Sequence, residues 1–256
     1  MPDSMLRSER KNCMARVLSV TSGKGGVGKS TLCVGLGMAY ALLGKSVLMI
    51  EFDVGLRGMD LMLGISDRIV YDLGDLLEGR CNINKAIVES PWNPNLNVIV
   101  APVSMESSIS IEDVNILVAG LRPHFDIIIL DTPAGLGFSM RIASTSDLAL
   151  VVATPDSVCV RDGGKVVGAL QKAHMNNHRL VINRVNSKLV KKQIVSDLDE
   201  VIDGVGSQLI GVLPEDQEMQ VCTSKGLPLT EDTRIVRICK AIALRIEGEY
   251  IPLLVN

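Results

Sequence analysis

The sequence has few aromatic residues and no surplus of positive charge. Among its 256 residues are one Trp, three Tyr and three Phe, and the formal net charge is −3. Proteins that bind single-stranded nucleic acid stack bases on aromatic side chains, and a basic surface holds the phosphates. We therefore do not expect nucleic acid as a partner.

Paired cysteines are also missing. The six cysteines and three histidines form no C-x-x-C and no metal-ligand spacing, a pattern typical of reduced thiols in a cytosolic protein. An iron–sulfur electron-transfer or carrier protein is thus a disfavoured alternative, because it requires such a motif or cysteines paired across a dimer interface.

Long apolar runs are absent as well. None approaches the roughly 20 residues that span a bilayer, and the first 14 residues lack the apolar segment of a signal peptide. We expect residues 1–14 to be a polar tail, residues 15–256 to form one domain, and the protein to be cytoplasmic.

Apolar runs alternate with amphipathic segments along the rest of the chain. This alternation predicts a single α/β domain with a mainly parallel twisted sheet and helices on both faces. The expected strands are 17–20, 46–50, 97–100, 126–130, 148–152, 180–182 and 209–212, and the expected helices are 29–43, 111–121, 138–145, 157–174, 192–202 and 234–247.

A glycine-rich turn lies between the first predicted strand and the first predicted helix. Residues 23–30 read G-K-G-G-V-G-K-S, a full match to the phosphate-binding loop G-x-x-x-x-G-K-[ST]. Glycine backbone amides and the helix N-terminus cradle phosphates, Lys29 reaches the β/γ-phosphates and Ser30 ligates Mg²⁺ directly. The predicted nucleotide-binding residues here are Gly23, Lys24, Gly25, Gly26, Val27, Gly28, Lys29, Ser30 and Thr31.

The same glycines also match the dinucleotide pattern G-x-G-x-x-G, for which Glu51 is the candidate ribose-binding acid. A dinucleotide loop gives no reason for Lys29 and Ser30 to follow its last glycine. A nucleoside triphosphate loop requires both, so we favour a P-loop NTPase over an oxidoreductase.

Two acids end predicted strands. Asp131 follows the apolar run 127–130, and Asp53 closely follows the run 46–50. Parallel strands bring their carboxyl ends to one edge of the sheet, where nucleotide-hydrolysing enzymes keep the carboxylate that orients Mg²⁺ and its waters. We predict that Asp53 and Asp131 hold the metal through water.

Further motifs carry a family resemblance. Lys24 within the loop is similar to the signature lysine of the deviant Walker A ATPases, the ParA/MinD family. Residues 53–61, 68–73 and 131–135 resemble the MinD branch in particular, and weaker similarities occur at 160–162, 182–184 and 211–216. The resemblance covers Arg16 to about residue 247.

This resemblance implies an ATPase that dimerises around ATP and acts as a spatial switch in cell-division (septum) site selection. ATP is the implied substrate and Mg²⁺ the cofactor, with a MinC-like inhibitor and an activating protein as partners. The implied catalytic residues are Lys29 in its own subunit, Lys24 reaching across the dimer, and Asp53 positioning the attacking water. Base contacts are implied at Asn183, Arg184, Pro214 and Glu215.

The sequence departs from that family in two places. Glu51 stands where the family usually has Asp, and no basic amphipathic helix follows Gly248, so attachment to the inner face of the cell membrane lacks support. The helix at 234–247 has an apolar stripe and four cations, which fits a core face or a membrane-surface face. A ParA-like DNA-partitioning ATPase and a flagellar-number regulator remain open.

Overall fold

The computed structural model describes residues 14–104, 108–192 and 196–253. Its centre is an eight-stranded sheet in the order β3-β4-β2-β5-β1-β6-β7-β8. All neighbouring strands are parallel except β3, which runs antiparallel to β4. The strands are β1 (Arg16–Thr21), β2 (Val47–Glu51), β3 (Val88–Glu89), β4 (Leu96–Ile99), β5 (Ile127–Asp131), β6 (Leu148–Ala153), β7 (His178–Val185) and β8 (Leu209–Pro214).

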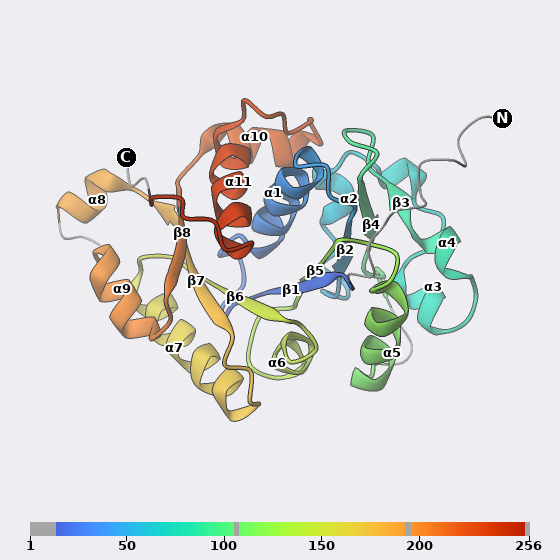
Figure 1. Ribbon diagram of the computed structural model, residues 1–256, viewed down its shortest axis with the longest axis horizontal. Helices are drawn as coiled ribbons and strands as arrows, with labels where there is room; N and C mark the ends of the chain where they lie inside the picture. The colour runs from blue at the N-terminus through green and yellow to red at the C-terminus, as the bar shows by residue number, and fades with distance from the viewer. Residues whose placement is uncertain (1–13, 105–107, 193–195, 254–256) are drawn as a thin grey trace.

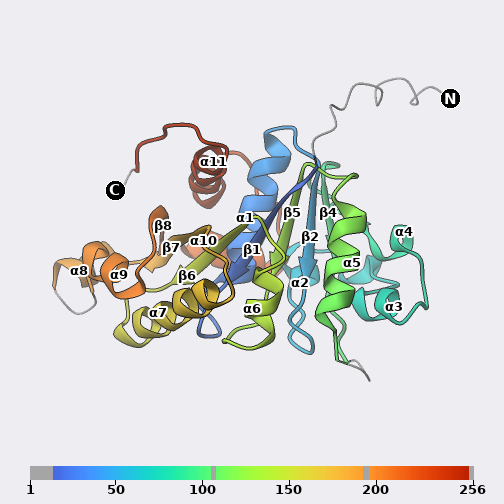
Figure 2. The same cartoon turned by 60° about the horizontal axis from the view of Figure 1, so that its bottom comes forward.

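Helices cover both faces of the sheet (Figures 1 and 2). One face carries α1 (Lys29–Leu42), α2 (Met59–Met62), α10 (Gln217–Lys225) and α11 (Arg234–Ile246). The other carries α5 (Ile111–Leu121), α6 (Phe138–Ala143), α7 (Ser157–Lys172) and α9 (Leu198–Val205). The shorter helices are η1 (Ser66–Arg68), α3 (Leu73–Leu77), α4 (Ile83–Ala86) and α8 (Ser187–Lys191).

The central strands are apolar along their whole length because both of their faces are covered. Every residue of β2, β5 and β6 is buried, as expected for parallel strands between two helical layers. The predicted α/β architecture with one mainly parallel sheet is confirmed.

Some predicted elements differ from the structure. The helix expected at 192–202 differs from the structure: Lys192 caps the end of α8, residues 193–195 lie outside the described part of the chain, and α9 begins only at Leu198. There Asp197 accepts a hydrogen bond from the Glu200 amide at 2.9 Å. This capping box starts a new helix in the middle of the expected one. Seven further elements were not predicted, and most of them are too short to show a helical period: η1, α2, α3, α4, α8, α10 and β3.

The apolar stripe of α11 belongs to the core. Ile235, Ile242 and Ile246 are 4%, 0% and 6% exposed and belong to the main apolar core cluster, and α11 packs on α1 and β8. Because the stripe already has a partner, a membrane-surface role for this helix is wrong. No helix within the described residues has the length and apolar character needed to cross a membrane. Residues 1–13 of the predicted tail lie outside the described part of the chain.

Candidate functional site

The glycine-rich turn lies at the carboxyl edge of the sheet, between β1 and α1. Gly26 and Gly28 adopt φ values of +76° and +98°, a region that L side chains rarely enter. The turn also lies at a topological switch point, because β1 is flanked by β5 on one side and β6 on the other. Ligands of open α/β sheets bind at such a point.

The two lysines of the turn differ sharply. Lys29 is only 7% exposed, and its charge lowers the pKa values of Asp53 and Asp131, although burial raises both overall. Lys24 is exposed. Burial raises the pKa of Asp156, but hydrogen bonds from Thr154 and Cys159, together with the Lys24 charge, lower it overall. Lys29 therefore lies inside the site, and Lys24 lies at its outer rim.

Asp131 is 1% exposed, and neither of its carboxylate oxygens has a hydrogen-bond partner within the described residues. Burial raises its pKa to about 6, against the effects of the nearby Ser30 hydroxyl and Lys29. The Ser30 hydroxyl comes close without completing a hydrogen bond. An unpaired buried carboxylate beside a hydroxyl fits a hydrated cation, whose waters would occupy both oxygens.

No group of three or more acids, cysteines or histidines within the described residues forms a metal-binding cluster. Mg²⁺ keeps several waters and takes further ligands from the phosphates of its nucleotide, so it needs few ligands from the protein. Of the three residues predicted to hold the metal, Ser30 and Asp131 lie close to each other, and Asp53 is close enough for its charge to raise the pKa of Asp131.

Asp53 lies in the loop between β2 and α2. It is half-buried, and burial raises its pKa while Lys29 lowers it. The charge of Asp53 in turn raises the pKa of Asp131. The structure therefore brings Lys29, Asp53 and Asp131 together at one edge of the sheet, as the strand-end pattern predicted.

The loop after β5 is tied directly to the phosphate-binding turn. The Gly135 amide donates to the Ser22 carbonyl at 3.0 Å, and the Thr132 hydroxyl donates to the Val20 carbonyl at 3.0 Å. A movement of residues 132–135 is thus coupled to the entrance of the turn.

The residues expected to contact the base fall into two groups. Asn183 is 7% exposed; its Nδ2 donates to the Val27 carbonyl at 2.7 Å and its Oδ1 accepts from the Arg184 amide at 2.8 Å. Pro214 and Glu215 lie at the end of β8, where Glu215 accepts from Asn186 at 3.1 Å. Asn183 therefore contacts the phosphate-binding turn itself, while the other group lies further out.

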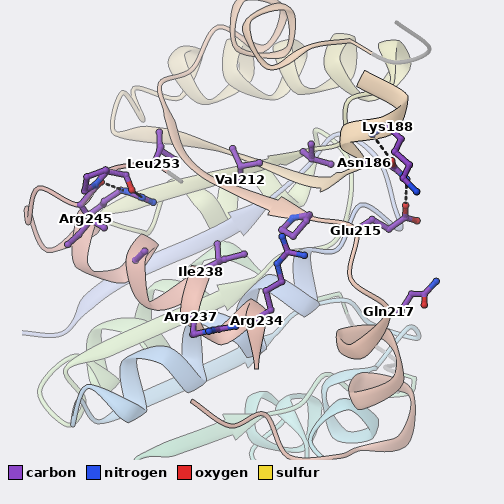
Figure 3. A pocket seen from close by; sticks show the side chains of 15 residues that line it. Asn186, Lys188, Val212, Glu215, Gln217, Arg234, Arg237, Ile238, Arg245 and Leu253 are labelled. Atoms are coloured by element: carbon purple, nitrogen blue, oxygen red, sulfur yellow. Dashed lines mark hydrogen bonds between the residues drawn. The ribbon is translucent and has the colours of Figure 1, made fainter. Parts of the chain in front are cut away.

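Pro214 and Glu215 line a cavity of about 810 Å³ between β8, α11 and the C-terminal segment. Figure 3 shows Arg234 extending from α11 toward the strand end that carries Glu215. Arg245 closes the far end, since it donates to the carbonyls of Ile210, Ile251 and Pro252 at 2.7–2.9 Å.

Neither Asp156 nor a structural role for Glu51 was predicted from the sequence. Asp156 follows the end of β6 by three residues, the same strand-end pattern that pointed to Asp53 and Asp131. Glu51 is 1% exposed and accepts three backbone amide hydrogen bonds. It therefore cannot serve as a ribose-binding acid, and the dinucleotide alternative is wrong on this point.

Comparison with known proteins identifies the family. Residues 18–229 match the CobQ/CobB/MinD/ParA nucleotide binding domain. The chain is 39% identical over 247 residues to the septum site-determining protein MinD of Synechocystis sp., covering 94% of this chain and 92% of the relative. The chain belongs to the MinD family. The MinD-like cell-division ATPase predicted from the sequence is thereby confirmed.

Solved MinD structures share the fold. The MinC:MinD complex of Aquifex aeolicus contains a chain with a TM-score of 0.86 and 36% identity, covering 94% of this chain and 98% of that one. MinD of Pyrococcus horikoshii, solved with Mg-ADP, gives a TM-score of 0.81 and 26% identity, covering 91% of this chain and 96% of the other.

Proposed function

We propose that this MinD-family ATPase is an ATP-dependent dimerisation switch in cell-division site selection, with Mg²⁺ as cofactor and ADP and phosphate as products. The observation that carries the proposal is the opposite placement of the two loop lysines. Lys29 is buried beside Asp53 and Asp131, whereas Lys24 is exposed at the rim. Lys29 can therefore act within its own subunit, whereas Lys24 gains a role when a second copy of the chain binds.

Each residue of the site then has a part in hydrolysis. The backbone amides of residues 23–31 and the Lys29 ammonium bind the phosphates, and Asn183, Arg184, Pro214 and Glu215 contact the base. Ser30 would ligate Mg²⁺ directly, and Asp53 and Asp131 would hold it through water; the metal would supply positive charge to the phosphates. Asp53 orients the attacking water, and it lies close enough to Lys29 for that charge to lower its pKa.

The partner's Lys24 would neutralise charge on the transferred phosphoryl group, as an arginine finger does. Apolar side chains at the carboxyl edge support a face that a second copy covers: Val54, Leu56, Leu136 and Val158 are 40%, 75%, 45% and 44% exposed. Exposed apolar side chains gathered on one edge are typical of a surface that a partner covers.

We further propose a MinC-like inhibitor as effector, since the Aquifex aeolicus relative was solved in a MinC:MinD complex, together with an activating protein. Residues 15–256 would form the ATPase domain and act in the cytoplasm, with residues 1–14 as a tail. Liposome sedimentation with ADP and with ATP tests peripheral association with the inner face of the membrane.

The decisive test mixes two inactive variants. Lys24→Ala lacks the crossing lysine and Asp53→Ala lacks the water-positioning acid, so neither homodimer should turn over ATP. In a mixed dimer, the Lys24→Ala subunit keeps Asp53 and receives Lys24 from its partner. We expect one working site and recovered phosphate release on mixing.

Light scattering provides the second readout. Asp53→Ala should form dimers with ATP, because hydrolysis no longer removes the bound ATP. With ADP it should be a monomer. Absence of an ATP-dependent dimer, or lack of activity in the mixture despite proven mixed dimers, would refute the switch.

A further inference from the structure

Glu51 at the end of β2 collects three backbone amides from two different segments. Its Oε1 accepts from Gly58 at 2.8 Å and Met59 at 3.2 Å, and its Oε2 accepts from Ala101 at 3.2 Å. Gly58 and Met59 form the start of α2, and Ala101 follows β4. One carboxylate therefore joins β2, α2 and the end of β4.

The loop that carries Asp53 lies inside this arrangement. It is held at its beginning by the Phe52 amide, which donates to the Asp131 carbonyl at 3.0 Å. In the middle, the Gly55 amide donates to the Pro102 carbonyl at 3.1 Å. Glu51 holds the far end through Gly58 and Met59, and holds the segment that carries Pro102 through Ala101.

We propose that Glu51 is a positioning residue for Asp53. It fixes the loop of residues 52–58 so that Asp53 stays beside Lys29 and Asp131, and does so without touching the nucleotide. The inference rests on the catalytic role of Asp53 proposed above.

The length of the side chain matters to this role. Glutamate has one more methylene than aspartate, and here its two oxygens reach amides on opposite sides, at α2 and after β4. An aspartate at the same strand position would have to draw these segments inward by about one carbon–carbon bond length to keep all three bonds. Its partner in strand register is Asp131, and like charges on neighbouring strands are unfavourable.

The test compares three variants with the wild-type protein. Glu51→Gln keeps the size but replaces one acceptor oxygen by a donor, which must face a backbone N–H on one side. Glu51→Asp keeps the charge and shortens the reach. Asp126→Asn is the matched control, since Asp126 accepts the Ser46 amide at 2.7 Å at the opposite end of β2.

We expect kcat to fall by about 10- to 100-fold in Glu51→Gln, the scale of a misplaced catalytic group, while the KM for ATP stays within a factor of about two. Glu51→Asp should lie between Glu51→Gln and wild type. Hydrogen exchange at Gly58, Met59 and Ala101 should speed up in both Glu51 variants. Asp126→Asn should lose melting temperature and keep its kcat.

An unchanged kcat in Glu51→Gln and Glu51→Asp, with a loss of melting temperature like that of Asp126→Asn, would overturn the proposal. If Glu51→Gln does not fold, the kcat and exchange rates of Glu51→Asp decide. Asp53→Ala is measured in parallel: wild-type turnover in that variant would refute the proposed catalytic role, whereas the exchange rates would still report whether Glu51 holds the loop.

Discussion

The side chain of Asn183 occupies the space that a side chain on Gly28 would need. A Cβ at Gly28 would lie 2.2 Å from Asn183 Nδ2, and the same Nδ2 donates to the Val27 carbonyl at 2.7 Å. The end of β7 thus contacts the phosphate-binding turn directly, over a sequence separation of 156 residues.

Gly28→Ala should weaken ATP binding by at least about tenfold, because left-handed backbone costs an L residue roughly 1–2 kcal/mol and the Asn183 contact adds to it. The double variant Gly28→Ala/Asn183→Ala should lose less ATP affinity than the sum of the losses of the two single variants, because removing the Asn183 side chain relieves the clash, although not the backbone strain. Fluorescence titration with a labelled ATP analogue measures ATP affinity in the two single variants and in the double variant. Strictly additive losses in the double variant would contradict this contact.

Replacing each loop lysine should give a different defect. Lys29→Ala should weaken ATP binding roughly 10- to 100-fold, the value of a charged hydrogen bond to phosphate. Lys24→Ala should bind ATP nearly as wild type does but lose turnover by about 1,000-fold, the scale of a finger residue supplied in trans. Titration of binding and single-turnover assays separate the two. Equal loss of binding in both variants would place Lys24 in its own subunit's site.

The nucleotide-free, metal-free protein should become less stable as the pH rises from about 4 to 7. Burial raises the pKa of Asp131 from 3.8 to about 6 and the pKa of Glu51 from 4.5 to about 7. The folded chain then binds more protons than the unfolded chain in this window, so the free energy of unfolding falls with pH. Each shift corresponds to a loss on the order of 3 kcal/mol.

Thermal unfolding at pH 5 and pH 8 measures this effect. Asp131→Asn should melt higher than the wild type at pH 8, because it removes a buried charge, and it should gain less melting temperature from Mg²⁺ with ADP. A wild-type protein that becomes more stable between pH 5 and pH 7 would contradict the prediction.

Gly226 and Gly64 bring two backbones into direct contact. Both have positive φ, and a Cβ on Gly226 would lie 2.7 Å from the Gly64 Cα. Gly226→Ala should therefore destabilise the fold by roughly 1–3 kcal/mol more than Gly248→Ala, which shares the positive φ but faces open space. Urea unfolding measures the free energy of unfolding of both variants. Equal losses would contradict the prediction, because they would show that the contact between Gly226 and Gly64 can relax without cost.

Much of this protein follows from local sequence. The match G-x-x-x-x-G-K-S, the apolar runs and the acids that follow them specify a phosphate-binding turn and place Asp53 and Asp131 after strands. These features depend on neighbouring residues, since backbone conformation and apolar periodicity are local properties. The longer strands and helices were predicted for the same reason, while α9 began later than expected because a capping box overrode the periodicity.

The strand order was decided only by tertiary structure. It sets β5 beside β1 and so brings Asp131 to Lys29. Two further contacts join residues far apart in the chain: Asn183 with Gly28, and Asp156 with Lys24. The three amide hydrogen bonds to Glu51 depend on how loops fold over the end of its strand. Local propensity does not specify which strands pair or which loops meet. The sequence by itself determined the phosphate-binding motif and the acids that follow the strands. Packing decided which of these residues support one another, because a buried polar group must find its partner wherever the fold places one.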